Sequence, residues 1–273
     1  MNRVEIESVE IELLLQAITK RYGYDFHNYS KASLKRRIIG FLHKSNLEQI
    51  SELIPRLLHD KGMFRSFLLS LSVTVTEMFR DPNVYVVLRE RVIPFLKTFP
   101  FCKIWCAGCA TGEEVYSIAI LLSESGLLDK VQIYATDIND ESLQKAELGI
   151  YSRTQIQEYT RNYQLTGLEG SFSDYYHASF DSVVMDASLK KNIVFANHNL
   201  VSDESFGKMQ LILCRNTLIY FNSELQGRVF SLFSESLVNK GFLCLGTKED
   251  IQFSSVSNKF RSIRQNEKLF QLR

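Results

Sequence analysis

The chain has 273 residues, of which 45% are hydrophobic and 23% are charged, and its formal net charge is +1. These values are ordinary for a globular protein of one or two domains, and the near-neutral charge gives no support for a nucleic-acid partner. No apolar run approaches the ~20 residues of a membrane span, and the first residues include acids in place of a signal-peptide pattern. We therefore expect a cytoplasmic protein without direct membrane insertion.

Residues 1–70 are expected to form a small all-helical domain. Apolar side chains recur there at helical spacing, in the stretches Ile11–Ile18, Leu34–Leu42 and Leu47–Leu58. The second stretch includes Lys35, Arg36 and Arg37, within a window at 26–47 that holds no acid. Two interpretations remain open: a solvated basic surface, or a docking face for an acidic partner.

Residues 71–100 are expected to link the two halves of the chain. The pattern at 71–82 alternates like a strand and then breaks at Asp81, and a helix follows at 84–95. Arg80 stands at this break. It could form a surface ion pair that contributes little to stability, or it could reach a ligand bound between two domains.

A strand, a glycine loop and a helix are expected over 103–120. The loop contains Gly108 and Gly112 but matches neither the triphosphate P-loop nor the dinucleotide fingerprint. Two acids, Glu113 and Glu114, stand at the start of the helix, where a phosphate would require positive potential. The loop therefore favours a cationic, hydroxyl-rich nucleotide such as S-adenosylmethionine.

The next expected strand, 131–137, ends in Asp137. In nucleotide-binding folds, an acid at this position accepts hydrogen bonds from ribose hydroxyls. The alternative is an N-cap for the helix expected at 141–148, a role for which Asp140 is better placed. We favour ribose binding for Asp137.

The remainder of the chain predicts an α/β domain over 101–273 with one interruption. Short antiparallel strands are expected as an insertion at about 165–192. The parallel pattern then resumes and runs to the C-terminus, with strands at 193–197, 209–214, 242–246 and 268–272, and a helix at 223–238 that stops at 239–241. Cys106 and Cys109 form a single C-x-x-C with no second pair, so no metal site is expected.

Six segments of the chain together resemble the CheR-type chemotaxis receptor methyltransferases. They occur in that family's order and are TEMFRD (76–81), WCAGCATGEEVYSIAI (105–120), ATDINDESLQKAELGIY (135–151), NHNL (197–200), LCRNTLIYF (213–221) and KGFLCLGTKE (240–249). The resemblance implies a Rossmann-like class I methyltransferase domain with a small antiparallel β insertion, preceded by an all-helical N-terminal domain.

The resemblance also implies an activity. The enzyme would transfer a methyl group from S-adenosylmethionine to glutamate side chains of chemoreceptors, giving glutamate methyl ester and S-adenosylhomocysteine. Its partners would be the cytoplasmic helices of methyl-accepting receptors, contacted through Lys35, Arg36 and Arg37, and it would act as a monomer. The alternative is a non-catalytic S-adenosylmethionine-binding regulator that docks on a signalling partner, since Thr74 and Lys248 depart from the family pattern.

The resemblance assigns roles to individual residues. It implies a reacting centre at Arg80 and Tyr220, with Glu114 at the methionine end of the cofactor and Asn199 near the adenine. The full set of implied cofactor contacts is Thr74, Thr76, Arg80, Gly108, Glu114, Asp137, Asn199, Leu200, Arg215 and Asn216. A glutamate with an ordinary pKa near ~4.3 is already ionised at neutral pH, so no general base is needed. Arg80 would orient the carboxylate, and Tyr220 would direct its oxygen.

Overall fold

The computed structural model describes residues 1–71 and 76–273, and these form two compact units. One unit combines Met1–Val73 with Ile219–Gln226, and the other combines Thr74–Leu218 with Gly227–Arg273. Across the described ranges, no helix has both the length and the apolar character that a membrane crossing requires. Thr74, an expected cofactor contact, lies outside the described residues.

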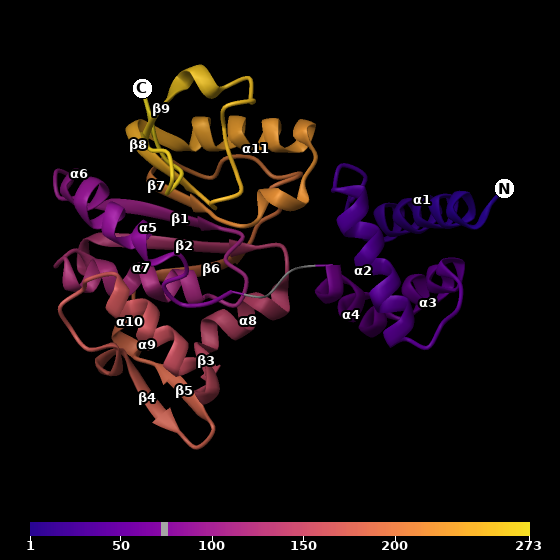
Figure 1. Cartoon of the computed structure of the whole chain (residues 1–273), viewed down its shortest axis with the longest axis horizontal. Coiled ribbons are helices and arrows are strands. Elements are labelled where there is room, and N and C mark those ends of the chain that lie inside the picture. The colour runs from indigo at the N-terminus through magenta and orange to yellow at the C-terminus, as the bar shows by residue number, and fades with distance from the viewer. Residues whose placement is uncertain (72–75) are drawn as a thin grey trace. The chain divides into compact units, whose positions relative to one another are not determined.

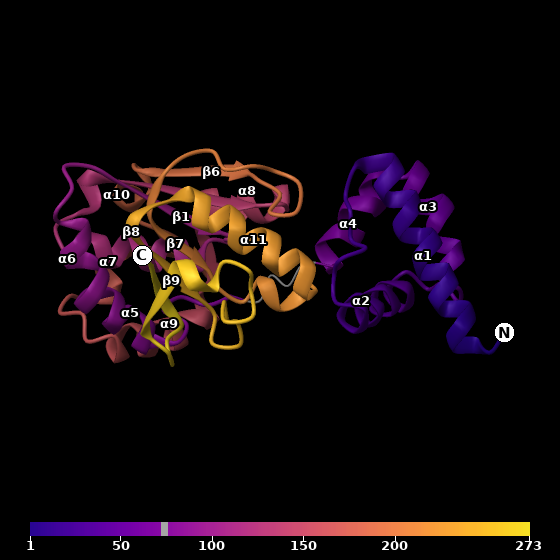
Figure 2. The same ribbon diagram turned by 90° about the horizontal axis from the view of Figure 1, so that it is seen from above.

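The first unit is helical, as expected from its apolar spacing (Figures 1 and 2). Its helices are α1 (Arg3–Tyr22), α2 (Lys31–Lys44), α3 (Leu53–His59) and α4 (Lys61–Leu71). Leu14, Ile38, Leu53 and Phe67, one from each helix, are completely buried and belong to one apolar cluster. The predicted all-helical N-terminal domain is therefore confirmed.

The second unit is built on a mostly parallel sheet. Within the described residues, seven strands pair in the order β6-β2-β1-β7-β8-β10-β9. Their bounds are β1 (Cys102–Ala107), β2 (Val131–Asp137), β6 (Ile193–Asn197), β7 (Met209–Cys214), β8 (Leu237–Leu245), β9 (Phe260–Arg264) and β10 (Leu269–Leu272). The helices of this unit include α5 (Pro82–Val87), α6 (Ile93–Leu96), α7 (Glu113–Glu124), α8 (Asp140–Leu148) and the part of α11 (Ser223–Ser236) that follows Gln226. The expected Rossmann-like order of strands and helices is confirmed.

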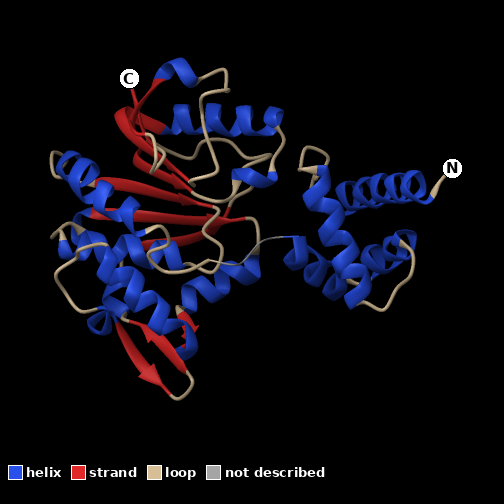
Figure 3. Cartoon of the chain, in the orientation of Figure 1, coloured by secondary structure: helices blue, strands red, loops and turns tan. Residues whose placement is uncertain are grey.

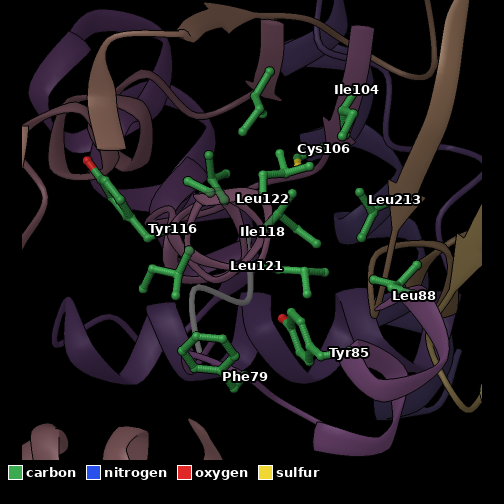
Figure 4. Close-up of a cluster of buried hydrophobic side chains, with 14 of the residues drawn as sticks. Phe79, Tyr85, Leu88, Ile104, Cys106, Tyr116, Ile118, Leu121, Leu122 and Leu213 are labelled. Carbon is green, nitrogen blue, oxygen red and sulfur yellow. The ribbon is translucent and has the colours of Figure 1, made fainter. Parts of the chain in front are cut away.

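Helices cover both faces of this sheet. On β1, Ile104 and Cys106 pack in one buried cluster with Ile118 of α7 (Figure 4). Trp105, between them, contacts Phe233 of α11 with ring centroids 5.4 Å apart. Because neighbouring strand residues point to opposite faces, α7 and α11 lie on opposite sides of the sheet. All six residues of β7 are buried, as a strand covered on both faces requires.

The expectation of a parallel pattern up to the C-terminus is wrong for the last two strands. β10 pairs antiparallel with both β8 and β9. The connection from Arg264 to Leu269 is a short turn, whereas a parallel crossover needs about a dozen residues or more. The predicted helix stop at 239–241 is also wrong, because α11 already ends at Ser236 and these residues lie within β8.

A second, antiparallel sheet interrupts the α/β pattern (Figure 3). It has the strand order β3-β5-β4. Its strands are β3 (Ile150–Ser152), β4 (Tyr176–Ser179) and β5 (Ser182–Met185). The same stretch of chain contains the helices α9 (Ile156–Leu165) and α10 (Ala187–Lys190). β3 precedes the stretch 165–192 where the sequence predicted the insertion, because a three-residue strand is too short to show alternation. The strand expected at 71–82 falls partly on 72–75, outside the described residues.

Candidate functional site

The glycine loop after β1 is fixed to the end of β2. The backbone N–H groups of Gly108 and Cys109 both donate to the Thr136 carbonyl, at 2.8 and 2.9 Å. Gly108 has a φ of +74°, and a Cβ added there would lie 2.5 Å from Thr217 Oγ1. Only glycine therefore satisfies both the backbone angle and the close packing at this position. The predicted cofactor residue Gly108 is thus part of a rigid turn at the carboxyl edge of the sheet.

Asp137, the predicted ribose contact, lies at this same edge. Its Oδ2 accepts from the Ala110 N–H and its Oδ1 from the Asn139 N–H, both at 2.9 Å. Burial raises the pKa of this carboxyl, and the backbone donors oppose the rise. The Ile138 N–H is a third backbone donor to this carboxyl, and since a carboxylate has about four lone pairs, one remains for a ligand hydroxyl. The N-cap of α8 is Asn139, so the expected capping role of Asp140 is wrong.

Arg215 holds two acids at the end of β7. Its Nη1 donates to Glu114 Oε1 and its Nη2 to Asp81 Oδ2, both at 2.7 Å. Its Nη2 also donates to the Arg80 carbonyl at 3.0 Å. The Arg215 side chain is only 3% exposed, and its Nε is a buried donor that has no partner among the described residues. The structure therefore brings the predicted residues Glu114 and Arg215 together, with the backbone of Arg80.

The loop that contains Arg215 and Asn216 is held by a residue absent from the predicted set. Glu249 is 4% exposed, and its carboxylate accepts from the N–H groups of Asn216 (3.0 Å), Leu218 (2.7 Å) and Gly246 (2.7 Å). Asn216 has a φ of +60°, a left-handed conformation that these bonds maintain. The available sequence signal was a single acid four residues after the end of a buried strand.

The segment that presents Arg80 is also anchored from its backbone. The Phe79 N–H donates to Ser117 Oγ at 2.9 Å, and Asn162 donates to the Met78 carbonyl at 3.2 Å. Phe79 is completely buried beneath α7 (Figure 4). The Arg80 side chain is half-buried, and within the described part of the chain its guanidinium makes no hydrogen bond or ion pair. Its charge acts on the nearby Glu77 carboxyl, whose pKa it lowers against the larger effect of burial, while its N–H groups remain available to a ligand.

Asn199 and Leu200 follow β6. The Asn199 side chain accepts from the Val201 N–H at 2.9 Å, and Leu200 is buried. The neighbouring His198 donates its backbone N–H to the Asp137 carbonyl at 3.2 Å, which places this loop beside the end of β2. The His198 ring packs against Trp105 with centroids 5.2 Å apart. This histidine therefore has a packing role.

Thr76 lies on the wall of a pocket of about 330 Å³. The residues that line this pocket are Thr76, Thr111, Glu113, Lys145, Ile150, Tyr151, Ser152 and Gln155. Glu113 is almost fully buried there, and burial raises its pKa to about 7. The Thr111 hydroxyl donates to Glu113 Oε2 at 2.6 Å. Glu113 and Glu114, adjacent in sequence, therefore have different surroundings.

Tyr220, the second residue of the predicted reacting centre, belongs to the segment Ile219–Gln226 of the helical unit. Its neighbours in that unit are on α2 and in the turn before it. Its role in the reaction stays a prediction, as do the cofactor contacts of the residues above.

The charges at this edge of the sheet fit the expected cofactor. Arg215 is a single cation that is shared by Glu114 and Asp81, so this cluster has a net negative charge. A negative cluster attracts the ammonium and sulfonium of S-adenosylmethionine and repels a pyrophosphate. The remaining lone pair of Asp137 suits a ribose hydroxyl, and the buried Arg215 Nε offers a donor.

Comparison with known proteins agrees with this fit. The model of the CheR methyltransferase SAM-binding domain matches residues 74–269, and that of the CheR methyltransferase all-alpha domain matches residues 9–72. A protein of Pseudomonas putida that is named as methyltransferase Cher3 is 49% identical over 96% of both chains. A chemotaxis protein methyltransferase of Listeria monocytogenes is 29% identical over 86% of this chain and 88% of its own.

A chemotaxis protein methyltransferase of Vibrio parahaemolyticus is 26% identical over 97% of both chains. These matches extend over both units of the structure. The chain therefore belongs to the CheR methyltransferase family, and it is an S-adenosylmethionine-dependent methyltransferase.

Proposed function

We propose that this protein methylates the side-chain carboxylates of glutamates in the cytoplasmic helices of chemoreceptors. The relatives named as chemotaxis protein methyltransferases support a role in chemotaxis, since they align with almost the whole chain. The non-catalytic alternative is not favoured, because these relatives are named as enzymes. The products are a glutamate methyl ester and S-adenosylhomocysteine.

The observation that best supports this substrate is that Arg80 has an anchored backbone and a guanidinium without a hydrogen bond to any described residue. Its backbone is anchored through Phe79 and through Arg215, while its guanidinium donates no hydrogen bond to the residues that the structure describes and interacts with the Glu77 carboxyl through charge alone. Guanidinium groups bind carboxylates through paired, charged hydrogen bonds. A guanidinium with available N–H groups can therefore hold a glutamate carboxylate in one orientation.

The reaction needs orientation more than it needs proton transfer. The bound cofactor supplies an electrophilic methyl group on a sulfonium. A carboxylate oxygen forms the new bond to carbon as the bond to sulfur breaks, and the sulfur keeps that electron pair, so no proton moves. Arg80 holds the acceptor oxygen in line, and the acidic cluster around Arg215 stabilises the cofactor's positive charge before transfer.

Transfer of a labelled methyl group to receptor-containing membranes tests this proposal. A carboxyl methyl ester releases its label as methanol in mild alkali, whereas an N-methyl or S-methyl product keeps it. Label that survives alkali would contradict the ester product. Receptors whose methyl-accepting glutamates are replaced by alanine should take up no label.

Arg80→Ala tests the residue that the proposal depends on. It should lower the rate of methyl transfer strongly even at saturating S-adenosylmethionine, where a weaker cofactor contact no longer limits the rate. Arg89→Ala is a matched control, because it removes a half-buried arginine of the same unit whose guanidinium, within the described residues, donates to the Gly167 carbonyl. Equal activity of the Arg80 variant and the control would contradict the proposed role of Arg80.

A further inference from the structure

The three cations on α2 that the sequence predicted for receptor docking have different surroundings. Lys35 forms an ion pair with Glu7 at 2.7 Å, and Arg36 is exposed. Arg37 is half-buried, and its guanidinium carbon lies 4.6 Å from the centroid of the Tyr220 ring. Its Nη1 also donates to the Leu71 carbonyl at the end of α4. Arg37 therefore has two partners within its own unit.

The backbone around Tyr220 is attached to the turn before α2. The Ser30 N–H donates to the Tyr220 carbonyl at 2.7 Å. On the next residue, Phe221 forms a β-bridge with Tyr29 and contacts its ring with centroids 5.0 Å apart. The Asn222 N–H donates to the Asn28 carbonyl at 2.9 Å. The main chain at Tyr220 is thus held by consecutive residues of one turn.

These contacts fix the main chain of Tyr220 but not its side-chain torsions, which depend on the side chains around the phenol ring. A guanidinium over an aromatic face is attracted by the ring's negative quadrupole. Because the Arg37 guanidinium is itself bonded to the Leu71 carbonyl, it is a fixed surface against which the Tyr220 ring lies. The arrangement limits movement of the ring about χ1, the torsion that decides where its hydroxyl oxygen lies.

We propose that Arg37 is a positioning residue for Tyr220, and that its charge serves the methyl-transfer step instead of receptor docking. The inference rests on the proposed function, because it gives Tyr220 the role of directing the acceptor oxygen. Loss of the Arg37 side chain should therefore affect turnover, whereas loss of a docking charge should affect the affinity for the receptor.

The test compares the kinetics of Arg37→Ala, Arg37→Lys and Arg36→Ala with receptor as substrate. Arg37→Ala should lower kcat by about five- to thirtyfold with little change in KM, the range expected from one cation–π contact. Arg37→Lys keeps a cation at this position and should recover part of the loss. Arg36→Ala removes the same charge from the same helix without a ring contact, so its effect should be confined to KM.

The same substitution in a protein that lacks the Tyr220 ring distinguishes an effect on that ring from a general effect of losing the Arg37 charge. In a Tyr220→Leu protein there is no ring to orient, so adding Arg37→Ala should change kcat no further. Arg37→Ala that raised KM with kcat unchanged, or that lowered kcat equally with and without the Tyr220 ring, would overturn the proposal.

A failure of the proposed function can be distinguished from a failure of this inference. If the wild-type protein methylates no receptor, the contact is still measurable as a coupling in the unfolding free energies of the Arg37→Ala, Tyr220→Leu and double variants. A favourable coupling supports the contact, and additive effects overturn it. Lys20→Ala, on the exposed surface of α1, controls for the loss of a positive charge from this unit.

Discussion

Replacement of Glu113 by glutamine should change how the stability of the protein depends on pH. Glu113 is 4% exposed, and burial raises its pKa from 4.5 to about 7. The unfolded chain loses this proton near pH 4.5 and the folded chain near pH 7, so folding takes up a proton between these values. The Glu113 contribution to stability is therefore fully present below pH 4.5 and is lost as pH rises through about 7.

The size of this effect follows from the pKa rise. A rise from 4.5 to about 7 corresponds to roughly 3 kcal/mol of unfolding free energy. Glutamine is neutral at every pH and can still accept the Thr111 hydroxyl that now bonds to Glu113. Glu113→Gln should therefore be the more stable protein above pH 7, and its advantage should shrink by roughly 3 kcal/mol on going to acid pH.

Urea unfolding at several pH values measures this difference. Trp105 is the only tryptophan and is completely buried, so its fluorescence reports on the unit that contains Glu113. Other titrating groups are common to both proteins, and their effects cancel in the comparison. Parallel stability curves for the two proteins between about pH 4.5 and about pH 8 would refute the reasoning.

Three further substitutions test the site. Glu249→Gln should lower the unfolding free energy by about 2–4 kcal/mol, because the new amide faces N–H donors that now bond to a carboxylate. Gly108→Ala should lower it by a similar ~2–4 kcal/mol, from its positive φ and from the clash with Thr217. Asp137→Asn should weaken S-adenosylhomocysteine binding about 10- to 100-fold by calorimetry, since a charged acceptor becomes neutral.

Each of these substitutions has an outcome that contradicts its premise. Glu249→Gln with wild-type stability would show that its bonds to the backbone contribute little. Thr217→Ala should relieve only the steric part of the Gly108→Ala loss, so a Gly108→Ala protein that is indifferent to this second change would argue against the clash. Unchanged affinity in Asp137→Asn would argue against a ribose contact.

The sequence predicted the elements that have a regular apolar pattern and the residues that stand where strands end. Apolar spacing identified α1, α2 and α3 of the first unit but not α4, and unbroken apolar runs identified β1, β2 and β7. Asp137 was singled out because it ends such a run, and Arg215, which the resemblance indicated, directly follows another. Local pattern is sufficient there, since neighbouring residues decide both the element and its end.

The contacts that the sequence did not reveal join residues far apart in the chain. Ser117 holds Phe79, and Glu249 holds Asn216 and Leu218, through bonds to backbone N–H groups. Every residue except proline has a backbone N–H group, so the identity of the donor residue gives no sign of such a bond, and neither pair could be inferred. The contrast between Glu113 and Glu114 is of the same kind, because only their tertiary surroundings differ.

The division of the chain limits how related proteins can be recombined. The helical unit takes Ile219–Gln226 from the second half of the sequence, and Phe221 within it is buried against Tyr29. A chimera that exchanged only residues 1–73 with a relative would pair a foreign turn with the native Phe221. Exchange of an intact helical unit between family members would therefore require both segments to be transplanted together.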